Sequence, residues 1–167
     1  MKVGIYGGSF NPFHEGHLKV IENVLEDRLV DEVWIVPCKR NPLKKDYEYW
    51  TDDKRLESIW DKVGGLVNVR VMLTELENDK EVTYTSETLK EFSEKYPQHR
   101  FCLIIGADEW MVFNKWKRWG WIIDNFKIYV HPRHGWDYDD AGFENVKYLK
   151  EFESLNISAT EIRNKTK

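Results

Sequence analysis

The sequence has few cysteines and no long apolar run. Its two cysteines, Cys38 and Cys102, lie far apart and outside any CxxC pattern, which argues against a disulfide framework or a zinc site. No apolar window approaches the ~18 residues of a membrane-spanning helix, and the stretch at the N-terminus is too short for a signal peptide. We therefore expect a cytoplasmic protein with free thiols and no membrane partner.

Charge of one sign is not in excess either. The 25 basic and 29 acidic residues give a net charge of −4, which disfavours a general electrostatic attraction to nucleic acid or to an anionic membrane. The basic and aromatic cluster KWKRWGW at 115–121 is short, so a nucleic-acid-binding module is a weak hypothesis. Any phosphate that binds this protein has to be held by local groups.

Along the sequence, segments with the apolar spacing of a strand alternate with segments that have the apolar spacing of a helix. β-Rich apolar runs predict strands at 2–6, 32–37, 67–72, 101–105 and 127–131. Helical spacing predicts helices at 17–27, 52–63 and 86–96. The helix at 52–63 is expected to bury Leu56, Ile59, Trp60 and Val63. This alternation predicts a Rossmann-like α/β fold, a doubly wound parallel sheet in a single domain over 1–167, with 132–145 as its least regular surface segment.

The stretch GGSFNPFHEGH at 7–17 directly follows the first predicted strand. In such folds ligands bind beyond the carboxyl ends of the strands, where loops lead into helices. Gly7 and Gly8 allow a phosphate to approach the main chain, and the N–H groups that begin the next helix favour an anion. His14 and His17 stand at the start of that helix, with Gly16 between them, and each can donate a hydrogen bond to phosphate.

Two other interpretations of this stretch are weaker. Two histidines three residues apart are half of a metal site, but His99, His131 and His134 are scattered along the chain. A phosphate loop of the G-x-x-x-x-G-K-[ST] type would need a lysine after the glycines, and none follows at that spacing. We therefore expect phosphate binding without a metal held by the protein.

Five motifs in a fixed order identify a resemblance that spans nearly the whole chain. GGSFNPFHEGH resembles the HxGH signature of the nucleotidyltransferase superfamily, and ISATEIRNK at 157–165 is similar to its ISSTxIR element. Three further segments resemble the nicotinate or nicotinamide mononucleotide adenylyltransferase family: YTSETLKEF at 84–92, IIGAD at 104–108 and FNKWKRWGWI at 113–122. Pantetheine-phosphate adenylyltransferases and cytidylyltransferases match less well and stay as alternatives, as does a nucleotide-binding regulator without turnover.

The resemblance implies transfer of AMP from ATP to the 5′-phosphate of nicotinate or nicotinamide mononucleotide, with release of pyrophosphate. YTSETL together with KWKRW favours the nicotinate form. The implied catalytic residues are His14, His17 and Arg163. The implied ATP-binding residues are Gly7, Gly8, Ser9, Phe10, Gly106, Asp108, Ser158 and Thr160. The implied mononucleotide-binding residues are Lys44, Thr85 and Trp116. Mg²⁺ is expected to be carried mainly by the ATP phosphates.

Some of these residues also have an ordinary structural interpretation. Asp108 either accepts ribose hydroxyls or caps the next helix. Trp116 either stacks on the pyridine ring or packs in the core, as we expect for Trp110, Trp119 and Trp121. Lys44 and its neighbour Lys45 either reach the mononucleotide phosphate or are merely solvated.

Three features depart from the family pattern. The loop NPLKK at 41–45 has Leu43 where a PPHK-like loop would have histidine, which puts that substrate contact in doubt. Ala159 replaces a serine, while Ser158 and Thr160 keep their hydroxyls. The chain ends four residues after Arg163, so we expect the longer C-terminal helix of many relatives to be absent. A homo-oligomer is compatible with the sequence, but the pattern does not define one.

Overall fold

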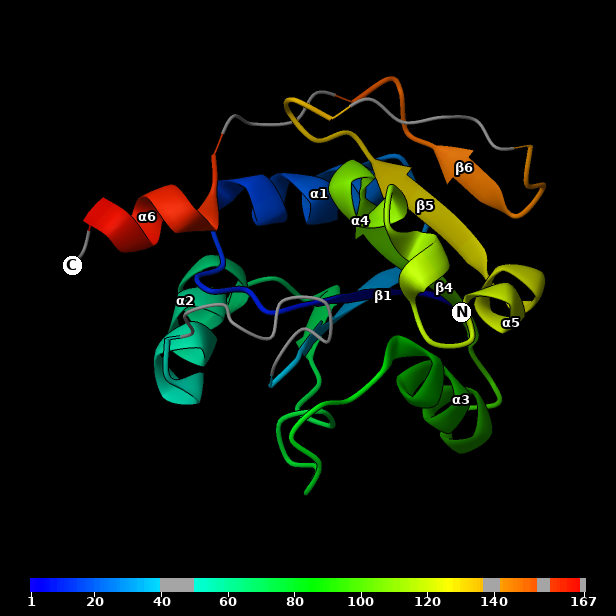
Figure 1. Ribbon diagram of the computed structural model, residues 1–167, viewed down its shortest axis with the longest axis horizontal. Coiled ribbons are helices and arrows are strands. Elements are labelled where there is room, and N and C mark those ends of the chain that lie inside the picture. Colours follow the sequence, from blue (N-terminus) through cyan, green and yellow to red (C-terminus); the bar gives the residue numbers. More distant parts are fainter. Residues whose placement is uncertain (40–49, 137–141, 153–156, 166–167) are drawn as a thin grey trace.

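A parallel sheet of six strands forms the centre of the computed structural model, which describes residues 1–39, 50–136, 142–152 and 157–165. The strands are β1 (Lys2–Gly8), β2 (Glu32–Pro37), β3 (Val69–Val71), β4 (Arg100–Gly106), β5 (Lys127–His131) and β6 (Val146–Tyr148). They lie side by side in the order β3-β2-β1-β4-β5-β6, and every neighbouring pair is parallel (Figure 1). The strand order reverses direction between β1 and β4, and this switch point is where doubly wound sheets bind ligands.

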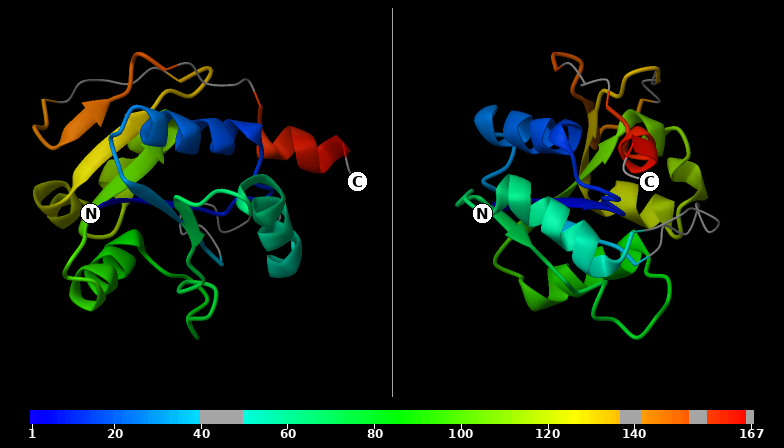
Figure 2. Two further views of the ribbon diagram at one scale, coloured as in Figure 1. Left: turned by 180° about the vertical axis from the view of Figure 1, so that it is seen from behind. Right: turned by 90° about the vertical axis from the view of Figure 1, so that its left-hand side faces the viewer.

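Helices cover both faces of this sheet. They are α1 (Glu15–Glu26), α2 (Asp52–Val63), α3 (Thr85–Lys95), α4 (Ala107–Trp110), the 3₁₀ helix η1 (Phe113–Lys115), α5 (Trp119–Asn125) and α6 (Ala159–Lys165). Figure 1 shows α3 beside α5, while α1 and α2 lie together elsewhere on the sheet. Figure 2 shows α6, in red, beside the start of α1, in blue.

Alternation along β1 divides the core into two clusters. Val3 and Ile5 point to the face that packs against Leu89 and Phe92 of α3. Tyr6 points to the opposite face, where apolar residues of α1 and α2 pack against β2. The buried sheet leaves its carboxyl edge, with the glycines at the end of β1, as the place where a ligand can reach the main chain.

The predicted strands and helices are confirmed with one correction, and the structure adds β6 and the short helices α4, η1, α5 and α6. β6 is a strand of three residues that follows the irregular segment 132–145, and the apolar pattern did not predict it. In α2 the buried face is shifted from the prediction, because Arg55 is 1% exposed while Trp60 is 51% exposed. The cause is polar, since the Arg55 guanidinium donates to the Ser9 and Cys38 carbonyls and to the Asp52 carboxylate.

Both cysteines are free and buried. Burial raises the pKa of each thiol to about 12, so neither is a thiolate near neutral pH. In the part of the chain that the structure describes, no helix is long and apolar enough to cross a membrane.

Candidate functional site

A cavity of about 500 Å³ opens at the switch point between β1 and β4. It brings together ten of the eleven residues predicted for catalysis or ATP binding: Gly7, Gly8, Ser9, Phe10, His14, His17, Gly106, Asp108, Ser158 and Thr160. These residues come from the ends of β1 and β4, the start of α1 and the start of α6. Segments far apart in the sequence therefore meet at one edge of the sheet.

The loop after β1 has a shape that depends on glycine at its start. A Cβ at Gly8 would lie 3.3 Å from the Phe10 ring, so a larger residue there would require this ring to shift slightly. Phe10 itself has φ 46°, a left-handed conformation that costs energy for a side chain of this size. Its ring is held by Tyr6, Phe13 and His17, with ring centroids 5.1–5.5 Å away. Aromatic packing thus fixes the loop that carries the predicted phosphate-binding main chain.

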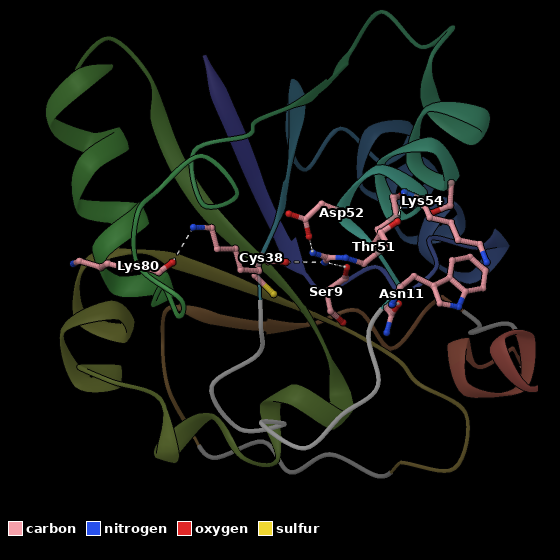
Figure 3. A network of polar contacts seen from close by, with 11 residues as sticks. Ser9, Asn11, Cys38, Thr51, Asp52, Lys54 and Lys80 are labelled. Carbon is pink, nitrogen blue, oxygen red and sulfur yellow. Dashed lines mark hydrogen bonds and ion pairs between the residues drawn. The ribbon is translucent and has the colours of Figure 1, made fainter.

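Two buried arginines donate hydrogen bonds to main-chain carbonyl groups of this loop. Arg55 Nη1 donates to the Ser9 carbonyl at 2.5 Å and to the Cys38 carbonyl at 2.7 Å, and Nη2 donates to Asp52 Oδ1 at 2.8 Å. Figure 3 shows Ser9, Cys38 and Asp52 converging on this guanidinium. Arg163 Nη1 donates to the Asn11 carbonyl at 2.5 Å. Because these carbonyls are turned toward the arginines, the loop can direct other main-chain groups to the cavity.

The two histidines form a reciprocal cap at the start of α1. His14 is the N-cap residue, and its Nδ1 accepts a hydrogen bond from the Gly16 N–H at 3.0 Å. His17 Nδ1 accepts from the His14 N–H, also at 3.0 Å. The two rings stack with their centroids 3.8 Å apart. This is the geometry of a capping box with imidazoles in place of the usual hydroxyl and carboxylate.

The cap determines which ring nitrogen carries the proton. A nitrogen that accepts an N–H bond holds no proton, so both neutral rings are protonated at Nε2. Burial is the main cause that lowers the pKa of His14 to about 4 and the pKa of His17 well below 6.5, and the nearby charge of Arg133 adds to both effects. His14 Nε2 is buried without a hydrogen-bond partner among the described residues. The empty protein therefore presents a neutral, unsatisfied N–H donor at the cavity.

Gly16 is required by the same arrangement. A Cβ at this position would lie 2.8 Å from Cε1 and 3.0 Å from Nδ1 of the His14 ring. The ring could keep its bond to the Gly16 N–H only by shifting. The glycine between the histidines is thus a packing requirement of the His14 cap.

Asp108 lies where β4 leads into α4, and its carboxylate folds back over Gly106. A Cβ at Gly106 would stand 2.7 Å from Asp108 Oδ1, so a larger residue at this turn would push the Asp108 carboxylate aside. No side-chain hydrogen bond caps α4, which leaves Asp108 lining the cavity and not acting as the helix cap. Arg133 Nε lies 3.8 Å from Asp108 Oδ2, and Arg133 lines the cavity too. The cavity therefore contains a partly exposed cation as well as its neutral donors.

The C-terminal motif has internal bonds of its own. Ser158 Oγ accepts from the Glu161 N–H at 3.1 Å, and Thr160 Oγ1 accepts from Arg163 Nη2 at 3.0 Å. Both hydroxyl residues line the cavity. Arg163 is 5% exposed and stands behind them, outside the lining. In this structure its guanidinium joins α6 to the loop after β1.

A second cavity, of about 90 Å³, adjoins the first. The two share Gly7, Gly8, Glu109 and Trp116 as lining residues. The smaller one is lined by Thr85 at the start of α3, so it joins two of the residues predicted to bind the mononucleotide, Thr85 and Trp116. The third, Lys44, lies outside the described residues, as do Leu43 and Lys45.

Trp116 fits both of its interpretations. Its ring packs against the core cluster of α3 and also lines both cavities. The main-chain N–H of Trp116 donates to the Phe113 carbonyl at 3.0 Å and so is already engaged. Trp110 and Trp121 pack against the same core, as expected, whereas Trp119 is 37% exposed because α5 turns it away from the sheet.

Sequence reasoning missed three charged residues of this region. Arg55 shares the buried face of α2 with Ile59 and Val63. A cationic residue at this helical spacing could have indicated a buried polar contact. Arg133 follows the end of β5, the edge at which such sheets bind ligands. Glu75 lies in the segment between β3 and α3, whose polar sequence gave no signal.

The fold and the site define a class, a doubly wound α/β protein that binds a nucleotide at its switch point. Comparison with known proteins agrees. The cytidylyltransferase-like family matches residues 5–165 of this chain. Two relatives, each named "Probable nicotinate-nucleotide adenylyltransferase", come from Bacteroides fragilis and Porphyromonas gingivalis. They are 36% and 34% identical over 97% and 98% of this chain, and the matches cover 80% and 83% of the relatives.

A solved structure has the same fold. Plasmodium falciparum nicotinic acid mononucleotide adenylyltransferase, complexed with NaAD, superimposes with a TM-score of 0.80 at 21% identity, covering 98% of this chain and 82% of that one. This chain belongs to the cytidylyltransferase-like family, with its nicotinate-nucleotide adenylyltransferase relatives.

Proposed function

We propose that this protein transfers AMP from ATP to the 5′-phosphate of nicotinate mononucleotide. An oxygen of that phosphate attacks the α-phosphorus of ATP, the bond between the α-phosphorus and the bridging oxygen breaks, and pyrophosphate leaves with the electron pair. The products are deamido-NAD and pyrophosphate. The observation that carries this proposal is the pair of adjoining cavities, which share Gly7, Gly8 and Trp116 and so offer sites for two substrates at one edge.

The larger cavity suits the triphosphate. Phosphoryl-type transfer needs positioning and neutralisation of charge more than covalent help from the protein. The Nε2–H groups of His14 and His17 are set for hydrogen bonds to phosphate oxygens, since their Nδ1 atoms are engaged in the cap. Arg133 supplies a nearby positive charge, and Asp108, which lines the same cavity, would accept ribose hydroxyls.

Mg²⁺ enters with ATP as part of the substrate in this proposal. Among the described residues, no group of three or more His, Cys, Asp or Glu side chains is placed to hold a metal ion. A hard cation of this kind commonly keeps phosphate oxygens and water as ligands. The chain itself would then contact the triphosphate mainly through N–H donors.

The smaller cavity suits the ring of the mononucleotide. The start of α3 lines it at Tyr84 and Thr85, and a helix N-terminus favours a carboxylate. Neutral N–H groups can donate hydrogen bonds to the carboxylate of nicotinate. The carboxamide of nicotinamide instead brings an NH₂ that needs an acceptor of its own. We therefore infer that nicotinate mononucleotide is preferred over nicotinamide mononucleotide.

Initial rates of pyrophosphate release test this function. The enzyme is mixed with ATP, Mg²⁺ and one acceptor at a time: nicotinate mononucleotide, nicotinamide mononucleotide or pantetheine phosphate, and CTP replaces ATP in a parallel series. We expect the highest kcat/KM with ATP and nicotinate mononucleotide. Preference for the amide would overturn only the choice of acceptor, and no release with any pair would favour a regulator without turnover.

A further inference from the structure

The smaller cavity contains a buried carboxylate for which adenylyl transfer has no direct use. Glu75 is 7% exposed and lines this cavity near Thr85 and Trp116. Both of its oxygens accept hydroxyl hydrogen bonds, from Thr83 Oγ1 at 2.6 Å and from Thr88 Oγ1 at 2.8 Å. The carboxylate is therefore held in a fixed place beside the start of α3.

Glu75 has hydroxyl partners on both of its oxygens. Burial raises the pKa of this carboxyl and the charges of Glu87 and Glu91 add to that effect, while the two hydroxyl donors stabilise the ionised form and lower it in part. Within the described part of the chain, no lysine, arginine or histidine forms an ion pair with Glu75. Lys115 and Lys117 also line the cavity, but Lys117 Nζ is bonded to Glu87 Oε1 at 3.1 Å. Burying an unpaired charge is costly, so a cationic ligand would relieve that cost.

We propose that Glu75 is the counter-charge for the pyridinium ring of the mononucleotide, an inference that rests on the function proposed above. The ring nitrogen of such a mononucleotide bonds to the ribose and carries a positive charge. The cavity, of about 90 Å³, has the order of size that accepts one aromatic ring. Trp116 gives it an aromatic wall, Glu75 adds a buried acidic group to its lining, and the start of α3 adds a positive helix end. A ring that carries both a cation and a carboxylate is the ligand these groups complement.

A pair of ligands that differ only in ring charge tests the proposal. The first is nicotinate mononucleotide, and the second is the C-nucleotide in which 3-carboxyphenyl replaces the pyridinium, with the same shape and no ring charge. Their dissociation constants are measured by calorimetry for the wild type, for Glu75→Gln and for Glu94→Gln. Glu94 is a suitable control because it is an exposed acidic residue of the same helix, α3, and does not line the cavity.

We expect the wild type to bind the charged ring on the order of tenfold more tightly than the neutral ring. Glu75→Gln should bring this ratio close to one, while Glu94→Gln leaves it unchanged. A merely structural Glu75 would weaken both ligands alike and keep the ratio, and that result would overturn the proposal. A wild type that binds and adenylylates both ligands equally well would also overturn it but would leave the proposed function standing, whereas a wild type that adenylylates neither would refute the function.

Discussion

His14 and His17 each do two tasks with one ring, and the division of tasks follows from their two nitrogens. Nδ1 accepts a main-chain N–H and caps α1, and Nε2 is left as a donor. An asparagine places its side-chain oxygen near the position of Nδ1 and has no group at Nε2. Substitution by asparagine therefore separates the structural task from the chemical one.

His17→Asn should keep the melting temperature close to that of the wild type and lower kcat by about a hundredfold or more, because charge on the departing pyrophosphate grows in the transition state. His17→Ala should lower kcat to a similar extent and also lower the melting temperature, since it loses the cap. The KM for ATP should change far less than kcat in both variants. Near-normal turnover by His17→Asn in a steady-state assay would mean that the Nε2–H of His17 has no part in the reaction.

The neutral state of these rings makes stability depend on pH. The pKa of His14 is about 4 in the folded protein, below its ordinary value of 6.5, so the unfolded chain binds more protons between these values. The free energy of unfolding should therefore decrease as the pH falls from about 7 toward 4, by up to about 2 kcal/mol for a fully neutral histidine between pH 6.5 and 5.

His14→Asn provides the comparison, because asparagine is a good N-cap and does not titrate. Urea unfolding at pH 7 and pH 5 should give a smaller loss for this variant than for the wild type. Equal losses in the two proteins would contradict the lowered pKa of His14.

At the scale of elements, the first turn of α1 depends on a residue without a side chain. Gly16→Ala would favour the helix intrinsically by up to about 1 kcal/mol, yet its Cβ would displace the His14 ring. We expect a melting temperature near that of the wild type together with a kcat at least about tenfold lower. Gly120→Ala in α5 is the matched control, because a Cβ there meets nothing within 4 Å, and it should leave kcat unchanged. If both variants have wild-type kcat, then the position of the His14 ring is not critical.

The buried side chain of Arg163 links α6 to the loop after β1. Arg163→Ala removes the donor to the Asn11 carbonyl and the donor to Thr160, so α6 should separate from that loop. We expect ATP affinity to fall about tenfold or more and the melting temperature to fall by a few degrees, since a buried carbonyl loses its partner. Calorimetry of ATP binding and thermal melting measure the two effects. Unchanged affinity with a collapsed melting temperature would assign Arg163 a purely structural role.

For the molecule as a whole, the sheet order explains why one edge collects both cavities. β1 and β4 part at their carboxyl ends, with Gly8 and Gly106 there, so loops on either side leave room between them. The cavities share the end of β1, so two substrates bound in them would meet over its glycines. A transfer reaction between two nucleotides needs this proximity.

Much of this arrangement could be predicted from local pattern. The spacing of apolar residues predicted β1 to β5. The glycines and histidines after β1 indicated the site, because backbone freedom and imidazole chemistry are properties of single residues. The role of Arg55 could not be predicted, since its partners are carbonyls of the loops after β1 and β2, which only packing brings together. The same holds for Glu75, whose hydroxyl partners lie across a turn. β6 escaped prediction because three residues are too few to show a period.

The most direct test of the account is the fate of the α-phosphorus of ATP. The enzyme is incubated with ATP labelled at that atom, Mg²⁺ and nicotinate mononucleotide, and the products are separated. Adenylyl transfer at this site predicts that the label appears in deamido-NAD in a one-to-one ratio with unlabelled pyrophosphate, and that His17→Asn slows its appearance by about a hundredfold. Label found only in free AMP or ADP, or retained in ATP while the mononucleotide binds normally, would contradict adenylyl transfer at this site.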